Sequence, residues 1–320
     1  MRYFQNIKNK VEHSKTLERA INRSKNTTLP GFSKISIYDV LTKTWQQIKD
    51  DDIFERASAI SYNFAMAFPP AIIFLFTLIP YVPISQSFIN EVYTLIMEIV
   101  PGPRNYTAII HFLDDFINNP RNDLLSVGFL LSLFFSSNAI IGVMRSFDKT
   151  LPGFTKRRGM NRRLAALKIT LVLFLAFFVC IALLVARAVV LKWLGIENEF
   201  VIGLITSLRW VLILVLFFFI NAYLYRSVPS IDKKWKILTP GAILSTILMA
   251  LSVVIFTWWV GSFGNYNKLY GSIGVIIILM VLVYLNSLSL LLGYELNVSI
   301  HTIERKKSEQ DSVMPDDAAV

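Results

Sequence analysis

Two arginines stand inside apolar stretches long enough to cross a lipid bilayer, where a charged side chain is costly. Arg187 lies about five residues from the far end of the stretch 169–191, and Arg209 lies about nine residues inside the stretch 200–225. In a helix these positions are roughly 7 and 13 Å deep. Because a guanidinium group forms paired hydrogen bonds with phosphate or carboxylate, the two arginines predict a shared outer cavity for an anionic headgroup.

A purely structural role is open for each arginine as well. Arg187 could extend to the headgroups at the nearby membrane surface, and the stretch that holds Arg209 could begin only at Trp210. An acidic side chain from an outer connection is the alternative counter-charge, and the candidates are Glu91, Glu197 and Glu199.

Polar side chains recur inside the apolar stretches and could contact a bound substrate. One tyrosine and four asparagines are the candidate substrate-binding residues: Tyr62, Asn63, Asn138, Asn221 and Asn286. Amides within a membrane more often form hydrogen bonds between helices, each contributing roughly 1 kcal/mol or less. Both roles remain open for these residues.

Prolines, a glycine and an asparagine are predicted to shape the helices. Pro69 and Pro70 remove backbone hydrogen bonds near the middle of the first stretch, which predicts a kink or a break. A kink would be a packing bend, whereas a break would turn free carbonyl groups toward a cavity. At 100° per residue, Asn286, Gly293 and Asn297 lie within about 40° of one another, so the last stretch should direct a small, polar face into the bundle.

The sequence contains no recognisable catalytic or metal-binding constellation. The three histidines, His13, His111 and His301, fall in three separate segments, and Cys180 is the single cysteine. A metal-dependent nuclease needs several His or Asp side chains around its ions. No Gly-rich loop ending in Gly-Lys-Ser/Thr is present either. We therefore expect no enzymatic activity, no metal and no cofactor, and any transport should be facilitated, gradient-driven or dependent on a separate ATPase.

The composition is typical of a membrane protein, with 54% hydrophobic and 17% charged residues and a mean hydropathy of +0.53. Six apolar stretches of about 20 residues predict an all-α integral membrane protein with six transmembrane helices. The stretches are Ala57–Tyr81, Leu124–Met144, Ile169–Leu191, Phe200–Tyr225, Ile237–Val260 and Gly271–Tyr294.

The distribution of cations predicts the orientation. Of the 32 Lys and Arg residues, 25 lie before the first stretch, in the second and fourth connections or after the last stretch, whereas 4 lie in the other connections. Cation-rich segments stay in the cytoplasm, so both termini are predicted inside. The same rule accounts for the net charge of +10, and no nucleic-acid partner is expected.

Three regions are predicted: a basic cytoplasmic arm with an interfacial helix (1–55), the transmembrane domain (56–300) and a disordered cytoplasmic tail (301–320). Within the domain, the outer connection 83–122 carries two apolar stripes separated by Pro101-Gly102-Pro103. This pattern predicts two amphipathic helices that either rest on the membrane or cap the bundle.

Five short motifs carry a family resemblance: Arg56-Ala57-Ser58-Ala59-Ile60-Ser61-Tyr62-Asn63, Tyr225-Arg226-Ser227-Val228-Pro229, Pro240-Gly241-Ala242, Tyr270-Gly271-Ser272-Ile273-Gly274 and Leu292-Gly293-Tyr294-Glu295-Leu296-Asn297. Together they resemble the YihY/virulence factor BrkB family of bacterial inner-membrane proteins, over about residues 37–300. Tyr294 stands where that family usually has a small residue, and Pro70 doubles a proline that is usually single. Gly271 and Gly274 are interpreted as structural positions.

The resemblance implies six spans with cytoplasmic termini and links to envelope lipid or lipopolysaccharide traffic, together with an old ribonuclease label that the residues above do not support. The leading hypothesis is a transporter or flippase-like protein for an anionic lipid or other amphiphile in envelope biogenesis. A scaffold that binds membrane lipids without moving them is the alternative. The sequence carries no signal for the substrate, the energy source or the oligomeric state.

Overall fold

The computed structural model describes residues 35–78, 103–118, 122–149, 151–194, 199–232, 234–262 and 266–313, and four positions between 89 and 97. Side chains are not described at some helical positions, chiefly within 181–207, 209–210 and 260–276. Every named element in these ranges is a helix: α3 (Ile37–Asp50), α4 (Ile53–Leu78), α6 (Pro103–Asn118), α7 (Asn122–Phe147), α8 (Gly159–Leu194), α9 (Glu199–Ser227), α10 (Pro240–Ser262) and α11 (Tyr266–Val313).

Five helices in the described part of the chain are long and apolar enough to cross a membrane: Ile53–Leu75, Leu125–Phe147, Gly159–Cys180, Pro240–Trp259 and Ile277–Gln310. They correspond to five of the six expected spans. The remaining expected span falls on α9, where the described apolar part is the shorter segment Val211–Ser227. An all-helical membrane protein is therefore confirmed, and the count of six stays a prediction.

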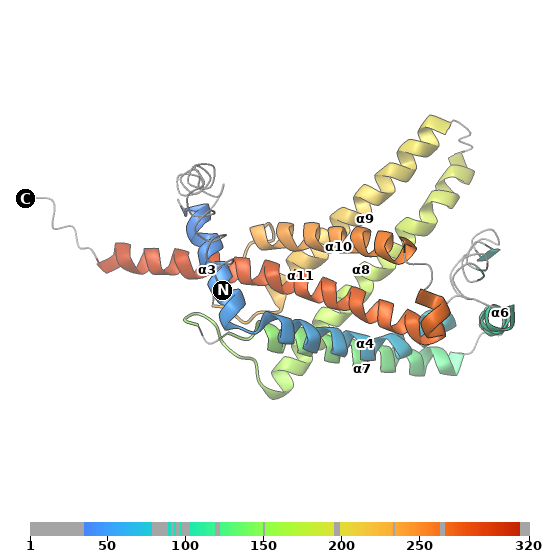
Figure 1. The fold of residues 1–320 in the computed structure, drawn as a ribbon, viewed down its shortest axis with the longest axis horizontal. Coiled ribbons are helices and arrows are strands. Elements are labelled where there is room, and N and C mark those ends of the chain that lie inside the picture. Colours follow the sequence, from blue (N-terminus) through green and yellow to red (C-terminus); the bar gives the residue numbers. More distant parts are fainter. Residues whose placement is uncertain are drawn as a thin grey trace, which may run out of the picture.

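The central bundle contains α4, α7, α10 and α11, and the hairpin of α8 and α9 runs at an angle to it (Figure 1). In the bundle α4 packs along α7, and α11 packs against both α10 and α4. The hairpin consists of α8 and α9, which pack against each other. The buried core of the bundle includes Ile60, Val143, Ala242 and Leu291.

The outside of the helices is covered by large apolar side chains. Leu130, Val254 and Trp258 are 63%, 65% and 70% exposed. A surface this apolar would drive association in water, but it is the surface that a protein presents to lipid tails. The burial pattern therefore agrees with the hydropathy of the sequence.

The expected interfacial helix is α3, which crosses the end of the bundle. Its N-cap is Ser36, whose side chain accepts a hydrogen bond from the Tyr38 amide. Gln47 is buried against α11, where it accepts a hydrogen bond of 2.5 Å from Ser299. Leu41 and Trp45 remain largely exposed on the other side. One face of α3 is thus anchored to the protein and another is exposed.

The first span remains helical through both prolines. α4 runs from Ile53 to Leu78 with Pro69 and Pro70 in its interior, so the break considered for this helix does not occur. Packing against α7 through Phe74 and Phe129, whose ring centroids are 5.4 Å apart, supports the segment after the prolines. Lost backbone hydrogen bonds are tolerated where neighbouring helices hold the chain.

The outer connection is helical where it is described. α6 begins at Pro103 and it contacts α4. This arrangement agrees with the second of the two expected amphipathic helices and with a contact to the bundle. The first expected helix, near 88–99, falls mostly outside the described residues.

The last helix is longer than expected. α11 continues without interruption to Val313, whereas the sequence placed the start of a disordered tail at residue 301. The physical reason is that Ile300 is buried with Val40 and Ile35 against α3, which stabilises the helix beyond the membrane. Residues 314–320 lie outside the described part.

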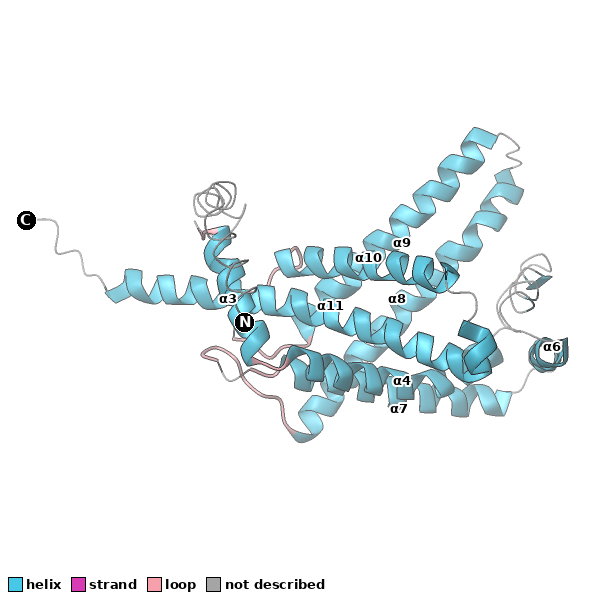
Figure 2. Cartoon of the chain, viewed as in Figure 1, coloured by secondary structure: helices cyan, strands magenta, loops and turns pink. Residues whose placement is uncertain are grey.

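The cation-rich segments gather at one end of the molecule, which we call the cation-rich end. α3, the start of α4, the α7–α8 and α9–α10 connections and the last turns of α11 all lie there (Figure 2). The two connections are joined by an antiparallel bridge between Phe154 and Ile231 and by a hydrogen bond of 2.8 Å from the Thr155 amide to the Ser230 carbonyl.

Because cation-rich segments remain cytoplasmic, a reporter fused after Val320 or within 156–163 should report the cytoplasm. A reporter near Arg104 should report the opposite side of the membrane. Fusions to alkaline phosphatase and to a fluorescent protein measure the two locations. A cytoplasmic signal from the Arg104 fusion would overturn the orientation.

Candidate functional site

Four charged side chains form a buried network at the cation-rich end. Glu295 of α11 is completely buried, and its carboxylate accepts hydrogen bonds from Lys149 at 2.7 and 2.8 Å and from Arg56 at 2.8 Å. Asp51, between α3 and α4, pairs with Lys149 and lies 3.8 Å from Arg56. We call these four residues the charge network.

Local structure holds each member of the charge network in place. Asp52 adopts a left-handed backbone conformation, with φ of 45°, which turns the chain sharply between α3 and α4. Lys149 follows α7 by two residues, and the end of α7 is capped by α11. The ring of Tyr294 stacks on Phe147 at 3.9 Å, and its hydroxyl donates a hydrogen bond of 2.5 Å to the Phe147 carbonyl.

The charge network is stable only while all its partners are present. A buried ion pair gains little over apolar packing, but a buried charge that loses its partner is strongly destabilising. The carboxylate of Glu295 compensates two cations at once, so it connects α4, the α7–α8 connection and α11. One guanidinium nitrogen of Arg56, Nη2, is buried without a hydrogen-bond partner among the described residues.

A second contact brings the backbones of α10 and α11 together at two glycines. A Cβ added at Gly241 would overlap the Gly293 carbonyl oxygen, and one added at Gly293 would lie 2.8 Å from the Ser245 Cβ. Asn297 Oδ1 accepts a hydrogen bond of 2.9 Å from the Gly241 amide, and its Nδ2 donates one of 3.1 Å to Thr239. Gly293 and Asn297 therefore face the bundle interior, as the rotation along the helix predicted.

An apolar groove of about 390 Å³ lies between the inner halves of α8 and α9. We call it the α8–α9 groove. Its walls are apolar side chains such as Leu173, Leu216 and Phe219, and Arg226 and Ser227 lie at its cation-rich end. Arg226 is exposed, and no ion pair to it is found in the described ranges. The groove thus combines an apolar slot with a guanidinium group at one end.

The predicted substrate-binding residues do not converge on one site in the described part of the chain. Tyr62 is 60% exposed, and Asn63 packs against Gly142 and donates a hydrogen bond within α4. Asn138 accepts a hydrogen bond from Arg163 of α8.

The other two amides serve helix contacts as well. Asn221 is buried and donates a hydrogen bond of 3.1 Å to Thr246, which links α9 to α10. Asn286 donates one of 2.8 Å to the Leu282 carbonyl in its own helix. Four of the five candidates therefore make helix–helix or intrahelical hydrogen bonds.

Arg187 and Arg209 lie on facing helices of one hairpin, in the outer parts of α8 and α9. The structure does not describe the side chains of Arg187 and Arg209. It also does not describe the side chains around Gly271 and Gly274 in α11. The predicted outer anion site remains a prediction.

Sequence reasoning missed the charge network and the position of Arg226 at one end of the α8–α9 groove. The sequence does contain a signal for the charge network, because Glu295 is the single Asp, Glu, Lys or Arg between Lys268 and Glu304. An acidic residue alone in an apolar stretch requires a buried cationic partner. The partners themselves, Arg56 and Lys149, cannot be identified by any spacing rule.

Electrostatics in the α7–α8 connection are set by burial. Burial raises the pKa of Asp148, although Arg162, whose Nη2 lies 2.9 Å from the carboxylate, opposes the shift. Burial also lowers the pKa of Arg157, which donates hydrogen bonds of 2.7 and 3.2 Å to the carbonyls of Val228 and Ser227. Arg157 thereby caps the carbonyl end of α9. No group of three or more His, Cys, Asp or Glu side chains that could hold a metal ion occurs in the part of the chain that is described.

Long apolar helices, a lipid-like exterior and a charge network at one end define a polytopic helical membrane protein. Residues 44–317 match the family model described as Virulence factor BrkB, which is most of the chain. The protein therefore belongs to the virulence factor BrkB family.

Curated relatives agree with this membership. A putative ribonuclease-like protein, YfkH of Bacillus subtilis, is 26% identical over 79% of this chain and 90% of its own length. A UPF0761 membrane protein of Idiomarina loihiensis is 25% identical over 66% of this chain and 72% of its own length. A UPF0761 membrane protein of Histophilus somni is 24% identical over 83% of this chain and 88% of its own length. No solved structure matches this chain.

Proposed function

We propose that this protein binds an anionic lipid, or a related anionic amphiphile, and moves it across the bacterial inner membrane without enzymatic activity. The observation that carries the proposal is the α8–α9 groove with Arg226 at its end. An amphiphile has the same division, with an apolar chain and a charged group at one end. Arg is suited to a phosphate group because its planar fork matches the oxygen geometry.

The length of the α8–α9 groove fits one leaflet. From Leu216 to Arg226 the helix rises by about 15 Å, which is half of a hydrocarbon core of roughly 30 Å. An acyl chain lying in the groove would reach the middle of the bilayer while its headgroup stayed beside Arg226. Because the lining is apolar, an acyl chain that enters the groove breaks no hydrogen bonds between the lining and water.

The same hairpin carries the two arginines expected to hold an anion in the outer leaflet. Arg187 precedes the end of α8 by seven residues, and Arg209 follows the start of α9 by ten. Their heights on the hairpin differ by only about 4.5 Å. A hairpin with an anion-binding arginine in each half offers an inner and an outer position for the same headgroup, and transfer between leaflets requires two such positions.

A scaffold that binds lipid without moving it is the second candidate, and the exposed face of α3 favours it. Leu41 and Trp45 are 58% and 60% exposed, and the Lys49 ammonium lies 5.3 Å from the centre of the Trp45 ring. Apolar and cationic groups together on an interfacial helix hold it to anionic headgroups.

Reconstituted protein should move a fluorescent phosphatidylglycerol between leaflets of a proteoliposome. Arg226→Gln should slow this movement at least about tenfold, because a hydrogen bond to a charged group contributes about 1.5 to 3 kcal/mol. Ala176→Phe, which fills the α8–α9 groove, should slow it as well. The double variant Arg187→Gln/Arg209→Gln tests the outer half of the hairpin. Dithionite quenching of the outer leaflet measures the rate.

Two controls separate the groove from general charge and volume effects. Lys307→Gln removes an exposed cation from the end of α11, and Val179→Phe adds volume on an exposed face of α8. Both should behave as the wild type. If the wild-type protein binds lipid without moving it, the scaffold is favoured. Equal rates of lipid movement for Arg226→Gln and Lys307→Gln would show that the groove does not carry the lipid.

A further inference from the structure

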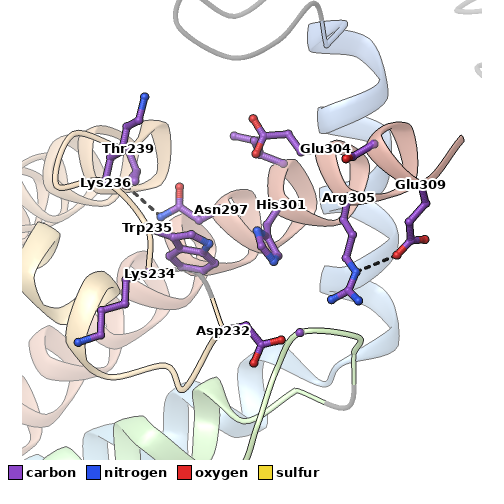
Figure 3. Close-up of a pocket in the computed structure, with 13 residues that line it drawn as sticks. Asp232, Lys234, Trp235, Lys236, Thr239, Asn297, His301, Glu304, Arg305 and Glu309 are labelled. Carbon is purple, nitrogen blue, oxygen red and sulfur yellow. Dashed lines mark hydrogen bonds and ion pairs between the residues drawn. The ribbon is translucent and has the colours of Figure 1, made fainter. Parts of the chain in front are cut away.

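The excess of positive charge at the cation-rich end does not lie in the cavity that opens there. That cavity, of about 690 Å³, lies between the α9–α10 connection and the last turns of α11. Figure 3 shows Lys234 and Lys236 directed away from each other and from Trp235. Three acids and three cations line the cavity: Asp232, Glu304, Glu309, Lys234, Lys236 and Arg305. Because these charges balance, the cavity has no net attraction for an anion.

The excess lies instead on the α7–α8 connection and the first turns of α8. From Arg145 to Lys168 the sequence contains eight Lys or Arg residues and a single acid, Asp148. Asp148 pairs with Arg162 at 2.9 Å, and the first turn of α8 contains no acidic residue. The other cations of this segment therefore have no carboxylate within the segment to compensate them.

Arg163 is the cation of this segment that reaches furthest along a membrane span. Its guanidinium group donates a hydrogen bond to Asn138 of α7 and lies 4.4 Å from the centre of the Phe134 ring. The span Leu125–Phe147 has 23 residues, so it is about 34 Å long and exceeds the hydrocarbon core by about 4 Å. Because Asn138 precedes the end of that span by nine residues, the guanidinium group lies roughly 10 Å inside the hydrocarbon.

Arg163 keeps unused hydrogen-bond donors at this depth. A guanidinium group has five N–H donors, and Asn138 accepts a hydrogen bond from only one of its nitrogen atoms. No ion pair to Arg163 occurs in the described ranges, and its nitrogen atoms are not among the enclosed atoms without a partner. The remaining donors are therefore open at the surface. A cation in hydrocarbon is costly, so these donors require an acceptor that can enter the membrane.

Exposed apolar side chains extend from Arg163 toward the middle of the membrane on both helices. Leu130 and Phe134 are largely exposed on α7, and Leu164 and Leu171 are largely exposed on α8. We call these four side chains and Arg163 the α7–α8 surface. It lies on the side of α8 that contacts α7, whereas the α8–α9 groove lies between α8 and α9, and the two share no residue.

We infer that Arg163 holds the phosphate group of an anionic phospholipid of the cytoplasmic leaflet, whose acyl chain lies along the α7–α8 surface. Phosphate oxygens match the paired N–H donors of a guanidinium group. The depth of the guanidinium group excludes a free phosphate ion, which does not enter hydrocarbon. The uncompensated cations nearby repel the ammonium group of a zwitterionic lipid and attract an anionic headgroup. This lipid is separate from the one proposed for the α8–α9 groove, and its binding does not depend on lipid movement.

Native mass spectrometry of the full-length protein, titrated with phosphatidylglycerol or phosphatidylcholine, measures the binding. All measurements use an Arg226→Gln background, which removes the headgroup contact of the α8–α9 groove, so failure of the proposed transport leaves this test intact. Phosphatidylglycerol should bind at least about tenfold more tightly than phosphatidylcholine, because the phosphatidylcholine headgroup carries a compensating ammonium group. Equal affinities for the two lipids would overturn the inference.

Substitution of the arginine then locates the bound lipid. Arg163→Gln should weaken phosphatidylglycerol binding at least about tenfold, since a hydrogen bond to a charged group is lost. Arg158→Gln is the matched control, because it removes an exposed arginine from the same segment, five residues earlier. It should change the affinity less than about twofold. An equal loss in both variants would show non-specific attraction and contradict the assignment.

A near-isosteric change at Asn138 tests the site without removing the arginine. Asn138→Asp supplies an internal carboxylate to Arg163, which should replace the lipid phosphate and weaken phosphatidylglycerol binding at least about tenfold. The midpoint of thermal unfolding in lipid-free detergent should not fall, because Arg163 gains a counter-charge. This result separates loss of the lipid from loss of the fold. Wild-type affinity for phosphatidylglycerol in Asn138→Asp would refute the proposal.

Discussion

Glu295→Gln is expected to destabilise the folded protein by about 3 kcal/mol. The substitution leaves Lys149 and Arg56 without their shared counter-charge while both remain largely buried. The expected value is at the low end of the range for a broken buried pair, because Asp51 stays near both cations. The midpoint of thermal unfolding in detergent, followed by size-exclusion chromatography, measures the loss.

A double-mutant cycle tests whether the loss comes from the charge network. Lys149→Met alone should also destabilise the protein, and adding Lys149→Met to Glu295→Gln should recover part of the loss, since fewer charges remain unpaired. Glu309→Gln is the control, because that acid is 61% exposed on the same helix. Identical midpoints for Glu295→Gln and Glu309→Gln would contradict the role of the network.

Gly293→Leu is expected to prevent correct packing of α10 and α11. Even the first carbon of the new side chain would meet the Gly241 carbonyl, the Tyr225 hydroxyl and the Ser245 Cβ, and the first of these is a backbone atom. Overpacking usually costs about 1 to 3 kcal/mol, and here neither backbone can yield, so we expect more. The fraction of monodisperse protein after solubilisation measures the effect.

A suitable comparison for Gly293→Leu lies on the lipid face. Val254→Leu adds volume at a side chain of α10 that is 65% exposed and should leave stability unchanged. Leu291→Ala is a poor comparison, because Leu291 is completely buried and its truncation should itself cost about 2 to 5 kcal/mol. Wild-type behaviour of Gly293→Leu would show that the two glycines do not hold the helices together.

Helix existence could be predicted from the sequence because it depends on local properties. Apolar length decides that a segment spans lipid, and rotation along a helix decides that Gly293 and Asn297 share a face. Both features depend only on residues that are close together in the sequence. The second apolar stripe of the connection 83–122 was predictable for the same reason, and it lies on α6.

Partner identity could not be predicted, because it depends on how distant helices pack. A polar residue in an apolar stretch signals a hydrogen bond but not its partner: Asn221 pairs with Thr246, whereas Asn286 bonds its own helix. The length of α11 was missed because residues 301–313 are polar, and their helix is stabilised by contacts of Ile300 with α3 that composition does not reveal.

The charge network also sets an order of events during synthesis. Arg56 precedes its partner Glu295 by 239 residues, and Lys149 precedes it by 146. At roughly 5 to 20 residues per second, Arg56 waits about 12 to 48 s for the ribosome to deliver that carboxylate. Until then the early helices must keep their cations in water or against lipid phosphates, so the bundle can close only when its last helix enters the membrane.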